Sequence, residues 1–187
     1  LCAVGVAVHA PPPRHPGRPG RAPALLRHPD RAGLSRLCAR GVVSEATREG
    51  LARVHAPQHI DAVAAFKTHG GGLIEADTWV SPGSNRAALL AAGTAVEAVK
   101  SVIEGEDSRA LGVVRPPGHH ARPGEPMGFC LYNSVAVAAV HARYRLGLDR
   151  IFIVAFAVPP RTGTQATFHP RPRFASLATP PLPFAPR

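Results

Sequence analysis

The fold of this chain is decided by the stretch Val114-Arg-Pro-Pro-Gly-His-His-Ala-Arg-Pro-Gly-Glu-Pro-Met-Gly-Phe-Cys-Leu-Tyr-Asn-Ser-Val-Ala-Val-Ala138. It begins in an apolar run of strand length, residues 110–115, which stops at residues 116–118 because neither a strand nor a helix passes through Pro-Pro-Gly. Residues 133–146 are rich in Ala and Val and predict a helix ended by a glycine. A second apolar strand is predicted over 150–158. Strand, helix and strand in this order predict a βαβ unit in a parallel sheet, and therefore an α/β fold.

Two adjacent histidines, His119 and His120, lie on the loop that follows the first of these strands. Open α/β sheets build their active sites at the carboxyl ends of the strands, and only a loop could direct two neighbouring imidazoles into one pocket. Histidine can take a proton from water and return it to a leaving amine near neutral pH. Gly128 would permit a close approach, and Phe129 could line an apolar channel. For the pair taken alone, a surface loop with incidental histidines remains the alternative.

Three parts of differing composition divide the 187 residues. Residues 1–43 form a Pro- and Arg-rich segment, and residues 44–158 form an orderly α/β core. Short helices are predicted over 48–54 and 59–66 in this core. Residues 159–187 form a degenerate tail with eight Pro and no periodicity, so we expect weak order there.

The clearest helix in the chain follows Pro82-Gly83. Ser84 is a suitable N-cap, and apolar side chains recur at helical spacing from Leu89 to Ile103 before Gly105. The length of the chain suits one domain with a real hydrophobic core.

The net charge of +10 is unevenly distributed. Residues 1–43 contribute +6, residues 44–150 are neutral, and residues 151–187 contribute +4. A nucleic-acid-binding protein is expected to gather its basic residues on one folded surface, with aromatic residues where single strands are bound. Here the excess lies in two Pro-rich flanks with few aromatic residues, so we do not expect a nucleic-acid partner.

Membrane insertion and a disulfide framework are both disfavoured. The longest apolar run, Leu1–Val8, is far shorter than the ~20 residues of a membrane span. It also lacks the flanks of a signal peptide. Three cysteines at wide spacing form neither a disulfide framework nor a zinc knuckle. We therefore expect a cytoplasmic protein without a membrane partner.

Four segments resemble, in order, the motifs of the histone deacetylase family, the zinc amidohydrolases that include the acetylpolyamine amidohydrolases. The stretch 114–138 is similar to the family signature. Residues 15–21 resemble an HPERPER element with both Glu replaced by Gly, and residues 54–63 resemble VHxPxYIxxV. Residues 77–84 and the following helix look like the bacterial and class II form. The likeness is strong from about Val54 to Val154, which corresponds to the N-terminal half of the family domain.

The resemblance implies the N-terminal part of an arginase/deacetylase-type fold, a parallel sheet flanked by helices and truncated. It also implies a hydrolase in which zinc polarises an acetyl-amide carbonyl and activates a water. His120 would then be the general base and acid, and His119 would assist electrostatically. A domain cut at its middle strands leaves an unpaired edge, so we expect poor solubility of the isolated chain.

The resemblance also assigns the substrate-binding residues. Gly128 and Phe129 would line the tunnel that grips the arm of an acetylated lysine side chain or an acetylpolyamine. Asp77 would match the rim Asp that holds substrate backbone amides. Arg21 would match an Arg near an internal product channel.

The zinc-binding motif of the family, typically DxDVHHGNGTQ, is replaced in this sequence. Ala157 and Pro159 occupy the positions of two zinc ligands, and neither side chain has a lone-pair donor. Ala155 replaces the Asp that would support the first catalytic His and a structural cation, and Thr162 replaces the residue that would orient the second. No metal ligand is intact, and the family's third ligand comes later in the fold. The chain is therefore predicted to be inactive as its sequence stands.

Several readings remain open. The first is a fragment of a zinc-dependent deacetylase, and the second is a pseudoenzyme that binds acyl-lysine or polyamine without hydrolysing it. A basic nucleic-acid-associated protein is a third reading. A thiol hydrolase using Cys130 and a histidine is a minor fourth, because a packed thiol is the expected role of this residue. Asp→Ala, His→Pro and Asn→Thr can each arise by one A-to-C change, which favours a degraded or misread gene, with a genuine pseudoenzyme as the alternative.

Overall fold

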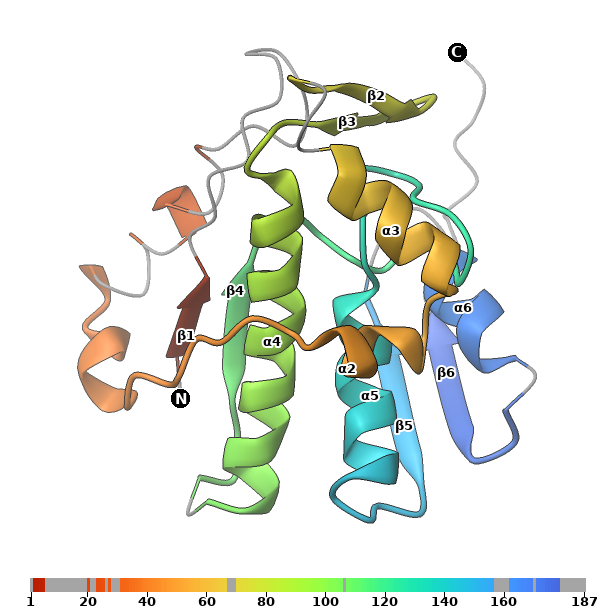
Figure 1. Cartoon of the computed structure of the whole chain (residues 1–187). Helices are drawn as coiled ribbons and strands as arrows, with labels where there is room; N and C mark the ends of the chain where they lie inside the picture. Colours follow the sequence, from red (N-terminus) through yellow and green to blue (C-terminus); the bar gives the residue numbers. More distant parts are fainter. Residues whose placement is uncertain are drawn as a thin grey trace, which may run out of the picture.

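The computed structural model has an α/β architecture in which long helices lie side by side along parallel strands (Figure 1). It describes residues 2–5, 20, 23–25, 27, 31–66, 70–105, 107–156, 162–169 and 171–178. In chain order the elements are β1 (Cys2–Gly5), η1 (Leu34–Leu37), α2 (Arg48–Ala52), α3 (Pro57–Ala65), β2 (Gly72–Glu75), β3 (Thr78–Val80), α4 (Ser84–Ile103), β4 (Leu111–Val114), α5 (Ser134–Tyr144), β5 (Ile151–Ala155), α6 (Thr162–Phe168) and β6 (Phe174–Ala178).

The strands pair in three separate ladders. β1 and β4 are parallel, with Cys2 opposite Leu111, and β5 and β6 are parallel, with Ile151 opposite Phe174. The predicted order β4, α5, β5 is confirmed, and both β4 and β5 belong to parallel pairs. Among the described strands, however, β4 and β5 are not hydrogen-bonded to each other, so the predicted βαβ unit does not form one continuous sheet. An apolar cleft of about 480 Å³, bordered by both strands and by α4 and α5, lies there instead.

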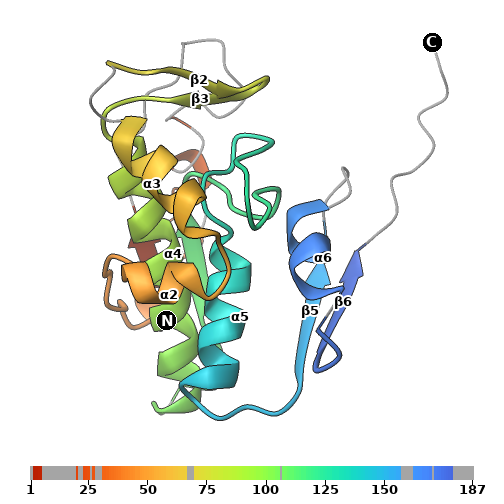
Figure 2. The ribbon, with the colours of Figure 1, turned by 45° about the vertical axis from the view of Figure 1, so that its right-hand side comes forward.

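The third ladder is the antiparallel hairpin of β2 and β3, which lies above the upper ends of α3 and α4 in both views (Figures 1 and 2). Gly71 precedes β2 with φ +105°, and a Cβ there would lie 2.9 Å from the Val80 carbonyl oxygen. The hairpin therefore closes tightly because residue 71 is glycine. It places Asp77 and Thr78 at the end of the molecule where the loop after β4 lies.

Local sequence signals fix the start of two helices, α2 and α5. The Thr47 hydroxyl accepts a hydrogen bond from the Gly50 N–H at 3.1 Å and caps α2. The Asn133 side chain caps α5 in the same way, accepting from the Ala136 N–H at 3.1 Å. The prediction of Ser84 as an N-cap is wrong, because Gly83 is the N-cap of α4. Ser84 is the first helical residue, and its hydroxyl accepts from the Ser81 N–H at 2.7 Å in the preceding turn.

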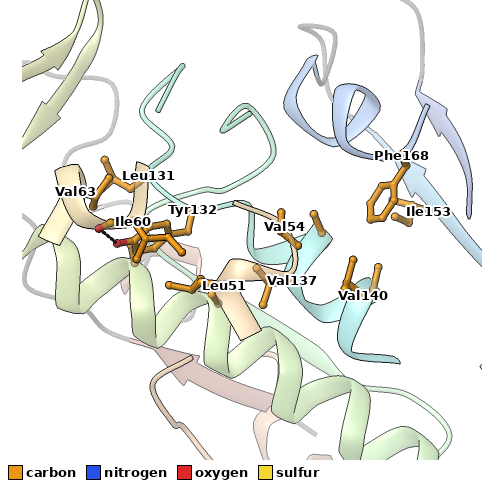
Figure 3. Packing of buried hydrophobic residues seen from close by; sticks show 14 of the residues in the cluster. Leu51, Val54, Ile60, Val63, Leu131, Tyr132, Val137, Val140, Ile153 and Phe168 are labelled. Atoms are coloured by element: carbon orange, nitrogen blue, oxygen red, sulfur yellow. Dashed lines mark hydrogen bonds between the residues drawn. The ribbon is translucent and has the colours of Figure 1, made fainter. Parts of the chain in front are cut away.

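The core joins α2, α3 and α5 to β5 and α6 (Figure 3). Its buried side chains include Leu51, Val63, Val137, Ile153 and Phe168. Because Phe168 comes from α6, the core extends beyond residue 158.

The expectation of weak order in 159–187 is wrong for the residues that form α6 and β6. The ring of Phe168 is buried and stacks on Phe174, with centroids 4.5 Å apart. None of the eight prolines lies inside either element, so the proline content of 159–187 does not exclude these two elements.

Among the described residues, the β5–β6 pair carries exposed large apolar side chains. Phe152, Val154 and Leu177 expose 63%, 43% and 58% of their surfaces. Figure 2 shows this pair with α6 beside it, joined to the α4–α5 layer by the chain that leaves α5. In the part of the chain that is described, no helix is both long and apolar enough to cross a membrane.

Candidate active site

The two predicted histidines lie together on the loop between β4 and α5. This histidine loop, residues 115–133, turns at residues 116–118, where a Cβ on Gly118 would lie within 2.6 Å of the Tyr132 carbonyl oxygen. His119 and His120 are both partly buried, and their ring centroids are 4.3 Å apart at an interplanar angle of 56°. The two imidazoles therefore lie against each other on the loop that follows β4.

Gly128 makes the close approach expected of it, and the neighbour is His120. A Cβ at this position would lie 2.7–2.9 Å from the Cδ2, Cγ and Cβ atoms of His120. The backbone of Gly128 also has φ +56°, a conformation that side chains rarely adopt. Both facts require glycine, because any larger residue would displace the His120 ring.

Phe129 continues the loop in a strained conformation. Its φ is +64°, the one positive value for a residue other than glycine among the described residues. Two hydrogen bonds from the β2–β3 turn hold this backbone. The Gly128 N–H donates to Asp77 Oδ1 at 3.0 Å, and the Phe129 N–H donates to Thr78 Oγ1 at 3.2 Å.

Asp77 and Thr78 thus act together on the loop backbone. Asp77 is exposed, whereas Thr78 is completely buried. The Thr78 hydroxyl donates to Asp77 Oδ1 at 3.0 Å, which leaves its oxygen to accept from Phe129. Thr78 is not among the residues predicted from the sequence. Its signal is its position beside Asp77 in an otherwise apolar strand.

Cys130 packs inside the same loop. It is fully buried; the His120 N–H donates to its Sγ at 3.4 Å, and the thiol donates to the Gly128 carbonyl at 3.4 Å. The expectation of a packed thiol is confirmed.

Helix α6 contacts the histidine loop from the other side. The Thr164 N–H donates to the His119 carbonyl at 3.1 Å. A Cβ on Gly163 would overlap the Ala121 carbonyl oxygen and would lie 2.5 Å from the His120 carbonyl oxygen. The Gly-Thr-Gln sequence that follows the replaced motif therefore retains a close backbone contact with both histidines.

Asn133 connects these parts from the end of the loop. It is fully buried, and its Nδ2 donates to the Ala121 carbonyl at 3.1 Å and to Thr164 Oγ1 at 3.2 Å. Its backbone N–H donates to Nε2 of His55 at 2.9 Å. Asn133 and His55 are also not among the predicted site residues, although both lie within the motifs quoted for the resemblance.

His55 and His59 form a second, buried histidine pair beneath the loop. Their ring centroids are 4.8 Å apart. Burial lowers the pKa of His55 from 6.5 to about 4, with the neighbouring His59 as the next cause. Burial also lowers the pKa of His59. Both imidazoles are therefore neutral at pH 7.

The predicted metal-site positions are only partly visible. Ala157 and Pro159 lie outside the described residues, as does Arg21. Ala155 ends β5 and is buried, with only 5% of its surface exposed. Among the described residues, no three His, Cys, Asp or Glu side chains gather in a group that could hold a metal ion.

The model of the histone deacetylase domain matches residues 15–179 of this chain. The chain belongs to the histone deacetylase family. It is 37% identical over 133 residues to a histone deacetylase-like amidohydrolase of Pseudomonas aeruginosa. The match covers 71% of this chain and 35% of that protein. It is 35% identical over 161 residues to the polyamine deacetylase HDAC10 of Homo sapiens, covering 83% of this chain and 24% of that protein.

The deacetylase fold is shown by a solved relative, the HD domain of HDA15. The TM-score is 0.88 at 32% sequence identity, and the match covers 95% of this chain and 52% of that domain. The predicted arginase/deacetylase-type fold is confirmed. This deacetylase-family chain spans about half of the solved domain, and less than half of a probable deacetylase of Methanothermobacter thermautotrophicus, of which it covers 46% at 36% identity.

Proposed function

We propose that this chain forms the proton-handling and acyl-binding side of an acetyl-amide site, as a fragment of a zinc-dependent deacetylase, and that by itself it does not hydrolyse amides. The observation that supports this most directly is the contact of Gly128 with His120. It sets the loop backbone, and with it Phe129, beside the histidine pair. The β2–β3 turn holds that backbone through Asp77 and Thr78.

The substrate class follows from the two kinds of surface that meet at this loop. Phe129 offers an apolar face suited to the aliphatic arm of an acetylated lysine or an acetylated polyamine. His120 would exchange a proton with the acetyl amide or its leaving amine, and His119, with its ring centroid 4.3 Å away, would assist electrostatically. Exposed Asp77 at the rim would hold amide groups of the substrate on one side while it holds the Gly128 N–H on the other.

Zinc does not fit the residues at the positions that the family motif assigns to it. When bound, zinc in this family polarises the acetyl carbonyl and activates a water. Here a buried alanine ends β5, and Ala157 and Pro159 offer no side-chain donor. We therefore expect the chain to lack the activated water on which the histidines would act.

Acetate release tests the proposed inactivity. The chain should release no acetate above a heat-treated control from an acetyl-lysine peptide or an acetylated diamine, with or without added zinc. Acetate release that is abolished by His120→Ala would overturn the proposal of inactivity. The two substrates separate protein from polyamine specificity if either is turned over.

Binding without hydrolysis is the second candidate, because the loop keeps Phe129 in a strained conformation that two hydrogen bonds hold. Calorimetry with an acetyl-lysine peptide and its unacetylated form would detect it. A binder should prefer the acetylated peptide at least tenfold and lose that preference in Phe129→Ala. Equal affinity for both peptides would exclude an acyl-binding role.

A nucleic-acid-binding role has little support. Six basic side chains of the described core contact a carboxylate: Arg48, Arg53, Arg86, Lys100, Arg122 and Arg143. Steeply salt-dependent binding to DNA would be required to revive this reading.

A further inference from the structure

Both ring nitrogens of buried His55 have a backbone hydrogen-bond partner. Only 2% of this residue is exposed. Its Nδ1 lies 3.0 Å from the Arg122 carbonyl oxygen, which can only accept, so Nδ1 carries the proton. Its Nε2 lies 2.9 Å from the Asn133 backbone N–H, which can only donate, so Nε2 is unprotonated. The two partners together require one neutral tautomer of the ring.

These two partners are the two ends of one segment. Residues 122–133 contain Gly128 and Phe129, so His55 ties together both ends of the part of the loop that would line the acyl channel. Neighbouring residues add two more ties. The Ala56 N–H donates to the Pro123 carbonyl at 2.8 Å, and His59 Nε2 donates to the Leu131 carbonyl at 2.8 Å.

Residues 55–59, which we call the histidine clasp, thus hold segment 122–133 at two points near each end. The contact reaches the proposed catalytic pair through Asn133. Its side chain donates to Thr164 Oγ1, and the Thr164 hydroxyl and N–H both contact the His119 carbonyl.

We propose that His55, as the neutral Nδ1–H tautomer, is the positioning residue of the loop 122–133, and that its protonation opens the clasp. A proton on Nε2 would face the Asn133 N–H, so two donors would oppose each other and that hydrogen bond would be lost. The Arg122 contact would survive, because Nδ1 remains a donor. Acid should therefore release the Asn133 end of the loop first.

The surroundings of His55 keep the clasp closed near neutral pH. The rings of His59 and Tyr132 pack against it, with centroids 4.8 Å and 5.7 Å away. Protonated His59 would oppose a second charge, and Tyr132 is neutral because burial raises its pKa. The charged groups that act on these two neighbours are the ion pair of Arg48 and Asp61, which acts on Tyr132, and exposed Glu125, which acts on His59. Burial of His55, with His59 beside it, lowers its pKa, so the clasp opens well below pH 6.5.

Nitrogen NMR and amide hydrogen exchange of the full chain test the proposal. At pH 7 the His55 ring should give the signature of a protonated Nδ1 and an unprotonated Nε2. The protection factor of the Asn133 amide should fall at least tenfold from pH 7 to pH 4, before those of the α4 amides. An Nε2–H tautomer, or a charged ring at pH 7, would overturn the assignment.

Two variants separate positioning from general stability. His55→Gln keeps an acceptor for Asn133, and it should retain most of the Asn133 protection while losing its pH dependence. His55→Leu should lower protection at Phe129 and Asn133 at least tenfold and leave α4 unchanged, whereas the exposed control His169→Gln should change neither. Uniform loss of protection across α4 and α5 in His55→Leu would contradict a local role. If that variant does not fold, the pH series on the unsubstituted chain decides.

The histidine clasp rests on the proposed function only in one respect, the assumption that loop 122–133 binds an acyl group. Its tautomer and exchange readouts require no acyl binding. If acetyl-lysine peptide fails to bind the unsubstituted chain while these readouts are as expected, the proposed function fails and the clasp stands.

Discussion

The histidine loop and the connection from β5 to α6 hold corresponding places in the fold but differ in the side chains they carry. Each follows the carboxyl end of a parallel strand and leads into a helix. The histidine loop keeps its chemical side chains, and three separate elements hold its backbone. Strand β5 ends at buried Ala155, and Gly163 and Thr164 of α6 lie against the backbone of His119 and His120. Packing contacts across the site are thus present beside the positions where we propose that the metal ligands are missing.

Breaking the contact between the two regions should have the largest effect. Gly163→Ala would place a methyl group on the carbonyl groups of His120 and Ala121. Backbone atoms cannot move aside cheaply, so we expect a loss of about 3 kcal/mol in the free energy of unfolding. Urea denaturation measures it. Gly124→Ala is the matched control, since a Cβ there meets nothing within 4 Å, and it should change stability by less than about 0.5 kcal/mol.

The second largest expected effect is a fall in the free energy of unfolding at acid pH, caused by His55 beside the histidine loop. The unfolded chain binds a proton at His55 near pH 6.5, whereas the folded chain does so only near pH 4. The unfolded state therefore binds more protons in this window, so stability falls as the pH drops and is unaffected by His55 above about pH 7. The contribution of His55 is a loss of about 2 kcal/mol by pH 4.5.

A denaturation series from pH 7 to pH 4.5 measures this loss. The pKa values of His59 and His141 are also lowered by burial, so they act in the same direction. His55→Gln isolates the His55 share, because its curve should be flatter. Equal slopes for both proteins would contradict the assignment of a buried neutral His55.

Removing one hydroxyl group should have the smallest effect on stability. Thr78→Val should destabilise the protein, and Thr94→Val should stabilise it. Thr78→Val leaves the Phe129 N–H without its acceptor and should cost about 1 kcal/mol. Thr94→Val is its matched control, because the buried Thr94 hydroxyl has no hydrogen-bond partner in the described part of the chain. It should stabilise the protein by up to about 1 kcal/mol. Thermal denaturation compares the two, and the same sign for both would show that Thr78 does not hold the loop.

The elements around the decisive stretch could be predicted because their signals are local. Proline and glycine end β4, an Asn side chain caps α5, and apolar spacing marks α4. Helix α6 could not, since Gly163 and Thr164 are stabilised by packing on the distant His119 backbone and not by helix propensity. Strand β1 likewise exists through its pairing with β4, far along the chain.

The site divides in the same way. His119, His120, Gly128 and Phe129 could be predicted from one contiguous segment, and the structure places them together. The residues that support them come from other segments, so their roles depend on tertiary contacts. A physical signal for His55 exists in the sequence: it precedes an apolar helix with a second His four residues later, as expected of buried histidines.

Zinc calorimetry tests most directly the proposal that this chain does not bind zinc, although α6 still packs on the histidine loop. The unsubstituted chain should show no stoichiometric zinc binding. The triple variant Ala155→Asp, Ala157→Asp, Pro159→His should bind zinc at least tenfold more tightly, because the retained packing of α6 on the histidine loop would hold the new ligands near the site. One tightly bound zinc ion in the unsubstituted chain would contradict the account.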